Sequence, residues 1–342
     1  MKYSLKKYNT FHTDTKSKLF EIVNTVEETI SILQKYKDEK ILILGEGSNT
    51  LFVNNYDGLI IKPNYKGIEV VKEDSENVYV KVHSGEIWDD FVKWCVERNY
   101  AGVENMAMIP GSVGSAVTQN IGAYGQTVID TLYSIEAIDI SKEKLTKFNP
   151  KKCGYRYRGS NFKHEWKNKY IVVSAIFKLK KNTKKFELSY TERAGRYGSL
   201  KEELDSFAKE PYSIQEVMKA IIMQRKKRLP SVKEYGTCGS FFENPIVSVE
   251  KYNELSKRIS ELQSYPVEEK EKVRIPAGRL LDELGWKGKW IGNVGTFDRH
   301  ALCVVTNKKA SGKEIYEYIQ KMKDSVLKEY GVELISEVNI IL

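Results

Sequence analysis

The segment Cys153–Ser160 has the side chains of a binding site for an anion. It reads CGYRYRGS, with arginines at 156 and 158 beside tyrosines. A guanidinium is always charged and can give a carboxylate or phosphate two parallel hydrogen bonds. The same pattern is also typical of a surface strand whose arginines contact solvent, so composition alone leaves both readings open.

Two further side chains could move or hold a proton. Ser240 lies in the run Gly239–Phe242 (GSFF), and Glu337 precedes the apolar run Val338–Leu342. A serine in a glycine-rich loop is usually a turn residue, and a glutamate before a strand is usually solvated. The GxSxG pattern of a serine hydrolase is absent. Cys238 is a second candidate nucleophile, but no histidine is near it in the sequence.

Two glycine-rich loops occur in the N-terminal half. Gly45–Thr50 (GEGSNT) follows the β-run Ile41–Leu44, and Ile109–Gly125 carries glycines at 111, 114, 122 and 125. Glycine lets the backbone approach a ligand closely. The first loop lacks the third glycine of a Rossmann turn, and alone it is equally typical of an ordinary turn. Together the loops favour a long ligand with a diphosphate.

The elements that must position these groups alternate between helix and strand. Capping boxes at Thr25–Glu28, Ser213–Glu216 and Ser311–Glu314 predict helix starts, and Gly331 predicts a helix stop. Another amphipathic helix is expected to start near Ser84. Strands are expected at Val78–Val82, Ser134–Ile138 and Tyr170–Phe177, and at the C-terminus.

The bulk composition excludes several classes of protein. The chain has 342 residues, which predicts more than one domain, and a formal charge of +9. The basic residues are interspersed with acids, which argues against a nucleic-acid partner. The four cysteines and four histidines are scattered, so we expect no disulfide framework and no metal. Without a long apolar run we expect a soluble, cytoplasmic protein that has no membrane partner and is a monomer.

Taken in order, four motifs resemble one family. Asn9–Phe11, the GEGSN loop, the IPGSVGS…QNIGAYG stretch and the GSFF segment together are similar to the UDP-N-acetylenolpyruvoylglucosamine reductases, and the similarity runs from Asn9 to Glu337. The resemblance implies the α+β FAD-binding fold of the vanillyl-alcohol-oxidase (PCMH) type, with a C-terminal α+β substrate domain. We expect FAD-binding subdomains at 1–65 (joined by strand 333–342) and 66–229, and a substrate domain at 230–332.

The resemblance implies FAD and NADPH as cofactors and UDP-N-acetylglucosamine enolpyruvate as the small-molecule substrate. It makes Arg158, Ser240 and Glu337 catalytic, with Arg156 as a neighbouring alternative to Arg158. Glu333 is the alternative to Glu337, which the Glu-Val-x-x-Ile spacing favours. The implied FAD-binding residues are Gly45, Glu46, Gly47, Ser48, Asn49, Thr50, Pro110, Gly111, Ser112, Gly114, Ser115, Gln119, Asn120, Gly122, Ala123, Gly125 and Arg225.

The implied substrate-binding residues are Tyr124, Tyr197, Arg228, Asn244 and Lys287. The insert 190–211 is typical of the family type with a tyrosine-bearing loop, in which Tyr197 fits better than Tyr190. Without the resemblance, Arg225 and Arg228 read as a basic helix end. Arg228 replaces a frequent lysine, and His300 stands where some relatives carry an amide.

Two other functions stay open at this stage. A flavin oxidase of the same fold, acting on an alcohol or sugar, would consume oxygen and need no NADPH. A non-catalytic nucleotide or nucleic-acid binder would use the positive charge and show salt-sensitive affinity. The sequence does not distinguish NADPH from NADH.

Overall fold

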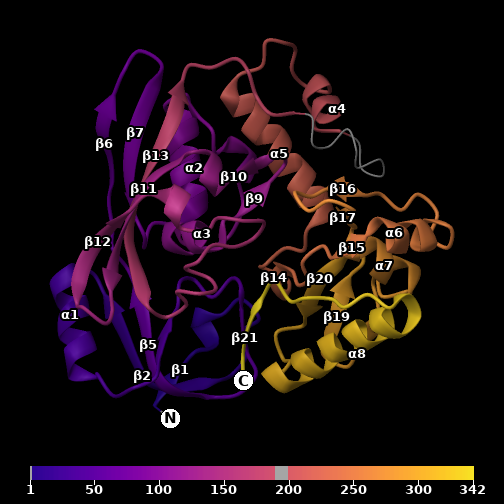
Figure 1. Cartoon of the computed structure of the whole chain (residues 1–342), viewed down its shortest axis with the longest axis horizontal. Coiled ribbons are helices and arrows are strands. Elements are labelled where there is room, and N and C mark those ends of the chain that lie inside the picture. The colour runs from indigo at the N-terminus through magenta and orange to yellow at the C-terminus, as the bar shows by residue number, and fades with distance from the viewer. Residues whose placement is uncertain (1, 189–198) are drawn as a thin grey trace. The chain divides into compact units, whose positions relative to one another are not determined.

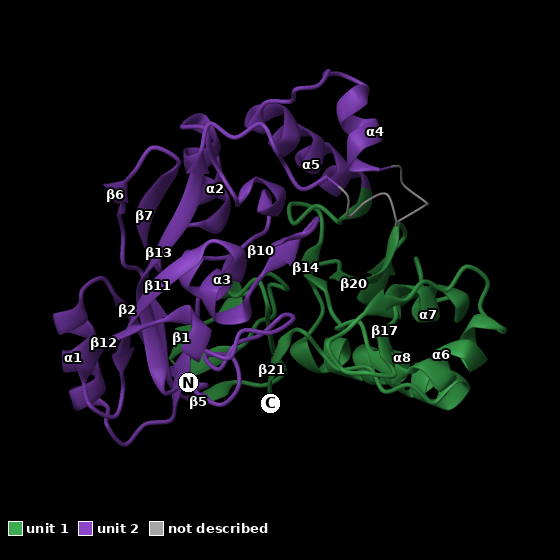
Figure 2. Cartoon of the chain, turned by 45° about the horizontal axis from the view of Figure 1, so that its top comes forward, with its two compact units in different colours: residues 1–17, 47–56, 228–342 green, residues 18–46, 57–227 purple. Residues whose placement is uncertain are grey.

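The computed structural model describes residues 2–188 and 199–342, which form two compact units (Figures 1 and 2). Unit 1 comprises 1–17, 47–56 and 228–342, and unit 2 comprises 18–46 and 57–227. This division follows contacts within the chain. The three-domain division expected from the sequence stays a prediction.

Helices in the described part of the chain include one long one near the C-terminus. They are α1 (Val26–Lys35), α2 (Trp88–Glu97), α3 (Val113–Gln119), α4 (Leu200–Asp205), α5 (Ile214–Arg228), α6 (Val249–Ser256), α7 (Ala277–Glu283) and α8 (Gly312–Tyr330).

Most strands of the N-terminal half lie in unit 2, although β2 and β5 each begin at the last residues of a unit 1 segment. They are β2 (Lys16–Val23), β3 (Ile41–Ile43), β5 (Tyr56–Pro63), β6 (Ile68–Glu73), β7 (Asn77–His83), β8 (Tyr100–Ala101), β9 (Gly122–Ala123), β10 (Gln126–Thr127), β11 (Leu132–Asp139), β12 (Lys144–Phe148) and β13 (Tyr170–Lys181).

Unit 1 takes its strands from both ends of the chain. They are β1 (Tyr3–Ser4), β4 (Thr50–Phe52), β14 (Gly236–Ser240), β15 (Ile246–Ser248), β16 (Tyr265–Pro266), β17 (Lys272–Arg274), β18 (Trp290–Ile291), β19 (Val294–Phe297), β20 (His300–Thr306) and β21 (Asn339–Ile341).

Unit 2 is built on an antiparallel sheet of order β12-β11-β13-β7-β6 (Figure 1). Its strands β7, β11 and β13 are mostly buried, and apolar residues of α2, α3 and α5 cover one face of the sheet. Trp88 and Phe91 of α2 pack against Phe177 of β13 with ring centroids 5.9 and 5.0 Å apart. This helix layer carries the second glycine loop.

A smaller sheet of unit 2 carries the first glycine loop. In it β5 lies between β2 and β3, and β3 and β5 are parallel. Leu33 of α1, Leu59 and Ile61 of β5, and Ile138 and Ile171 of the large sheet share one core. The loop at residue 45 therefore starts from a strand that is fixed by burial.

Unit 1 is built on an antiparallel sheet of order β14-β20-β19-β18. Helices α7 and α8 pack on one face, and α8 contributes Ile315, Ile319, Met322 and Val326 to that core. The capping box at Ser311 is present, and Gly331 ends α8 with φ +63°. Strand β21 pairs in parallel with β4, which joins the C-terminus to the GEGSN loop.

Most elements expected from the sequence are confirmed, and one helix start is wrong. The helix expected near Ser84 begins at Trp88. The Ser84 amide donates to Val173 O (2.8 Å) and its carbonyl accepts from Gly114 (2.9 Å), so this residue is held in a loop. Among the described residues, no helix is long and apolar enough to cross a membrane.

Candidate functional site

In unit 1, Ser240 lies at the end of β14, directly after a bulge. Thr237 pairs with Val305 and Ser240 with Cys303, so three steps along β14 match two along β20. Gly239 takes up the irregularity with φ +73°, which favours glycine. Because side chains alternate along a strand, the extra residue places Ser240 on the same face as Cys303 and Val305.

In unit 1, the main chain of Glu337 is hydrogen-bonded to Phe241, the residue that follows Ser240. Its amide donates to Phe241 O (2.9 Å), and its carbonyl accepts from the Asn49 side chain (3.2 Å). The Asn339 amide then donates to Asn49 O (3.0 Å). The structure therefore brings together three predicted segments: the end of the GEGSN loop, the GSFF segment and the C-terminal run.

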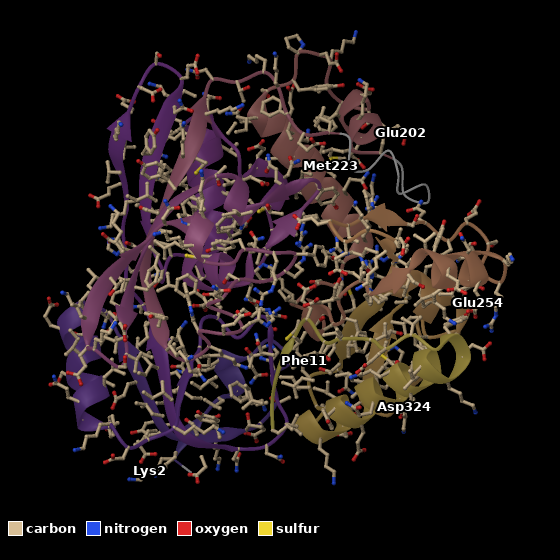
Figure 3. The ribbon with its side chains drawn as sticks, in the orientation of Figure 1. Lys2, Phe11, Glu202, Met223, Glu254 and Asp324 are labelled. Atoms are coloured by element: carbon tan, nitrogen blue, oxygen red, sulfur yellow. The ribbon has the colours of Figure 1, made fainter. Side chains whose placement is uncertain are left out.

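The Asn9–Phe11 motif completes this group of segments. The Thr237 amide donates to Thr10 O (3.0 Å), and the Thr10 amide donates to Gly47 O (3.3 Å). Phe11, labelled in Figure 3, packs against Phe241 with ring centroids 6.4 Å apart. Gly47 has φ +64°, and a Cβ there would collide with Tyr8 O. The motif thus has a structural role that its sequence did not reveal.

In unit 2, the two glycine loops meet at Gly45. A Cβ on Gly45 would collide with Ser115 Oγ and lie 3.0 Å from Ser112 Oγ, so only glycine fits without a shift. From strand β5, Lys62 Nζ donates to Gly45 O (3.3 Å) and to the Glu46 carboxylate. Sequence analysis missed Lys62. The feature that could have revealed it is a single basic residue within the mostly buried strand β5.

Helix α3 starts in the second loop, but its own amides are already used. Those of Val113 and Gly114 donate to Glu86 O and Ser84 O at 2.8 and 2.9 Å, and that of Ser115 to Ser112 Oγ at 3.4 Å. A diphosphate must therefore be held by other groups than this helix start. The glycine pattern does not identify those groups.

Polar atoms that suit a cofactor remain beside the second loop. Within residues 2–188 and 199–342, the buried Ser84 Oγ and Asn105 Oδ1 have no hydrogen-bond partner. Asn105 also donates to Tyr124 O (2.8 Å), next to the Gly122–Gly125 turn. Buried polar atoms are normally satisfied. These two, with the glycines and Lys62, fit a polar cofactor such as a flavin dinucleotide.

Arg158 occupies the second position of a two-residue turn between Arg156 and Gly159. Its φ of +53° is uncommon for a residue with a side chain and costs about 1 kcal/mol. The turn is anchored on α3: Ser160 Oγ donates to Thr118 O (2.6 Å), and Asn120 donates to Arg156 O (3.0 Å). Strain held by such anchoring is typical of functional positions.

The guanidinium of Arg158 reaches the second glycine loop. A Cβ on Gly122 would lie 3.0 Å from Arg158 Nη1. Arg156, in contrast, binds the Glu165 carboxylate at 3.1 and 3.3 Å, with both side chains exposed. The two neighbouring arginines therefore differ in their surroundings, and the choice of Arg158 as the arginine that meets a ligand stays a prediction. Arg158 lies in unit 2, whereas Ser240 and Glu337 lie in unit 1.

Several predicted binding residues have contacts within their own unit. Arg225 donates to Met108 O (3.3 Å), and Asn244 accepts from the Ala277 amide (3.0 Å) at the start of α7. Lys287 forms an ion pair with Asp282 (2.9 Å). Tyr124 is buried with φ +47°. Tyr197, like Tyr190, lies outside the described residues.

In unit 1, the charge of Arg228 acts on the imidazole of His300. Burial, followed by the positive charge of Arg228, lowers the pKa of His300 to about 4. Its Nδ1 accepts from the Leu302 amide (3.3 Å), so the imidazole carries its proton on Nε2. Such a neutral imidazole is, like a side-chain amide, a polar group without charge.

The cysteines have no features of nucleophiles or ligands. All four are buried, and none forms a disulfide. Burial raises the pKa of the Cys238 thiol to about 12, so it stays protonated at neutral pH. Within the described ranges, no group of three or more His, Cys, Asp or Glu side chains could hold a metal ion.

Comparison with known proteins identifies the family. Residues 231–341 match the model of the UDP-N-acetylenolpyruvoylglucosamine reductase C-terminal domain, and residues 18–149 match an FAD binding domain. A reductase of this name from Flavobacterium johnsoniae is 40% identical over 339 residues, which covers 99% of this chain and 98% of that protein. The chain belongs to the UDP-N-acetylenolpyruvoylglucosamine reductase family.

Other members and solved structures agree. The Bacteroides fragilis reductase is 35% identical, with 99% of each chain covered. The crystal structure of the reductase from Thermus caldophilus has a TM-score of 0.68 at 21% identity and covers 99% of this chain and 97% of its own. A 6-hydroxy-D-nicotine oxidase from Arthrobacter nicotinovorans has a TM-score of 0.53 at 12% identity and covers 95% of this chain and 84% of its own.

These findings confirm two expectations. The fold is the α+β FAD-binding fold of the vanillyl-alcohol-oxidase type, and the chain is an FAD-dependent oxidoreductase of the reductase family. Its ligands are small molecules. The roles of the individual site residues stay predictions.

Proposed function

We propose that this chain reduces UDP-N-acetylglucosamine enolpyruvate to UDP-N-acetylmuramate with NADPH. The observation that supports this most directly is membership of the reductase family over nearly the whole length. The contacts that join the GEGSN, GSFF and C-terminal segments in unit 1 agree with it. Bound FAD supplies the hydride transfer, with NADPH as the source of electrons.

The arginine has the role that best fits its chemistry. Addition of a hydride to the methylene carbon of the enolpyruvyl group leaves negative charge on the next carbon and its carboxylate. In this proposal Arg158 binds that carboxylate with two parallel hydrogen bonds and stabilises the enediolate. Glu337, as a protonated or hydrogen-bonded carboxyl, assists.

The remaining step is a proton transfer from Ser240 to the carbon that carries the charge. A serine hydroxyl is a weak acid, so its alkoxide needs stabilisation or rapid reprotonation. Cys238, two residues away, is buried among Thr10 and Thr50 and has no part in this step. In this proposal the substrate is bound by Arg228, Asn244, Lys287, Tyr124 and Tyr197.

We also propose an order of ligand binding, an oligomeric state and a cellular location. NADPH binds and leaves before the UDP substrate binds, as in a ping-pong reaction. The enzyme acts as a monomer in the cytoplasm. Neither nucleic acid nor a membrane takes part.

An absorption experiment tests the reaction. Purified holoenzyme has oxidised flavin bands, which NADPH bleaches under anaerobic conditions. Addition of UDP-N-acetylglucosamine enolpyruvate then restores the bands, with UDP-N-acetylmuramate as the product. Recovery with oxygen but not with the enolpyruvyl sugar contradicts the proposal and favours an oxidase.

A further inference from the structure

In unit 1, an exposed indole covers a glycine at the edge of the sheet. Trp290 of β18 pairs with Gly295 of β19, and a Cβ on Gly295 would lie 2.5–2.7 Å from Cγ, Cδ2 and Cε2 of Trp290. One face of the indole therefore packs on the glycine backbone. Trp290 is nevertheless 43% exposed, so much of its remaining surface is open to solvent.

Trp290 begins a row of aromatic side chains that ends in a cation. The ring centroids of Trp290 and Tyr235 are 6.3 Å apart, and those of Tyr235 and Phe297 are 5.9 Å apart. The guanidinium of Arg299 then lies 4.8 Å from the Phe297 centroid. Arg299 also contacts Asp298 (3.8 Å), and both side chains are exposed. Flat rings next to an arginine are the groups that bind the base and phosphates of a nucleotide.

The strand register places this row on the face of the sheet that carries Ser240. Directly paired residues point to the same face, and the pairs connect Ser240 to Cys303, then Val305 to Gly295, and Gly295 to Trp290. Helices α7 and α8 cover the opposite face. Three strand spacings and two residues along β20 separate Ser240 from Trp290 by about 16 Å.

We infer that Trp290, supported by Tyr235, stacks on the uracil of a UDP-sugar bound along this face. The inference rests on the proposed function, in which Ser240 acts at the enolpyruvyl end of the same molecule. The N-acetylglucosamine, the two phosphates and the ribose of the substrate must then span the distance from that end to the base.

Three variants separate stacking from a structural role of Trp290. Trp290→Leu keeps an apolar cover on Gly295 but removes the flat π-surface, whereas Trp290→Phe keeps an aromatic face. The matched control is Ile291→Ala, since Ile291 is the next residue, is 42% exposed and points to the other face. The measurements are the Kd of the holoenzyme for UDP by calorimetry, the KM and kcat for the enolpyruvyl sugar, and the melting temperature.

For Trp290→Leu we expect the Kd for UDP and the KM to rise about tenfold, in the range of base–aromatic stacking. Trp290→Phe should recover most of this loss. Ile291→Ala should bind UDP like the wild type, and NADPH should reduce the flavin at the wild-type rate in all three.

Two results overturn the inference. One is an unchanged Kd for UDP in Trp290→Leu, whatever happens to the melting temperature. The other is a slower reduction by NADPH with normal UDP binding, which assigns the row to the other nucleotide. If the wild type binds UDP through Trp290 but does not reduce the enolpyruvyl sugar, the proposed function fails and the stacking site stands.

Discussion

The two units hold their candidate site residues in different ways. In unit 1, Ser240 and Glu337 are placed mostly by main-chain hydrogen bonds among segments far apart in the sequence, such as Glu337 N to Phe241 O, with one bond from the Asn49 side chain. In unit 2, side-chain hydrogen bonds hold the corresponding segments. Ser160 and Asn120 bind the main chain around the Arg158 turn, and Lys62 binds the Gly45 carbonyl. A substitution at Ser240 should therefore report chemistry, because the main-chain pairing of β14 with β20 does not depend on the Ser240 side chain.

The largest expected effect tests this at Ser240. Ser240→Ala leaves the main-chain pairing of β14 with β20 in place and removes only the hydroxyl. Turnover of the enolpyruvyl sugar should fall by about 10²–10⁴, the usual contribution of a general acid. Stopped-flow measurement of each half-reaction should show flavin reduction by NADPH nearly unchanged. Equal loss in both half-reactions removes Ser240 from its assigned role.

In unit 2 the comparison can be made between two neighbouring arginines. Arg158→Met should lower kcat/KM by about 10²–10³, since it removes the charge that stabilises the enediolate. Arg156→Met is the matched control. Its exposed ion pair with Glu165 contributes about 0–1 kcal/mol to stability, so activity should stay near that of the wild type. The reverse ranking assigns the substrate carboxylate to Arg156.

Local contacts could be predicted from the sequence, whereas contacts between distant segments could not. The capping boxes at Ser213 and Ser311 and the stop at Gly331 are confirmed because each depends on residues within one turn of helix. The helix start at Trp88 was not predictable, because Ser84 is held by partners about 30 and 90 residues away in the chain.

Site residues follow the same rule. The glycine loops and the GSFF segment are recognisable as motifs, yet the contact of Gly45 with Ser115 depends on how two strands and α3 pack. Lys62 and Trp290 belong to no motif. Their partners are set by the parallel pairing of β3 with β5 and by the β18–β19 hairpin, which local sequence does not encode.

A smaller effect is expected where the loops of unit 2 meet. In Gly45→Ala the new Cβ collides with Ser115 Oγ, and overpacking of this kind costs about 1–3 kcal/mol. The variant should retain less FAD per protein and melt earlier. Ser115→Ala in the same chain should restore part of both, since it removes the colliding oxygen while Ser112 Oγ remains 3.0 Å away. Additive losses in the double variant contradict a direct contact.

The smallest effect concerns stability against pH in unit 1. The pKa of His300 is about 4 in the folded chain, against an ordinary value near 6.5. Between these two pH values His300 is protonated in the unfolded chain and neutral in the folded chain. The free energy of unfolding therefore falls as the pH falls through this window, and the stability that neutral His300 permits is fully present above it. His300→Gln keeps a neutral polar group beside Arg228 and removes the titration. Denaturant unfolding from pH 7 to pH 4 should therefore show a shallower loss in His300→Gln than in the wild type, and parallel curves would mean that His300 titrates alike in both states.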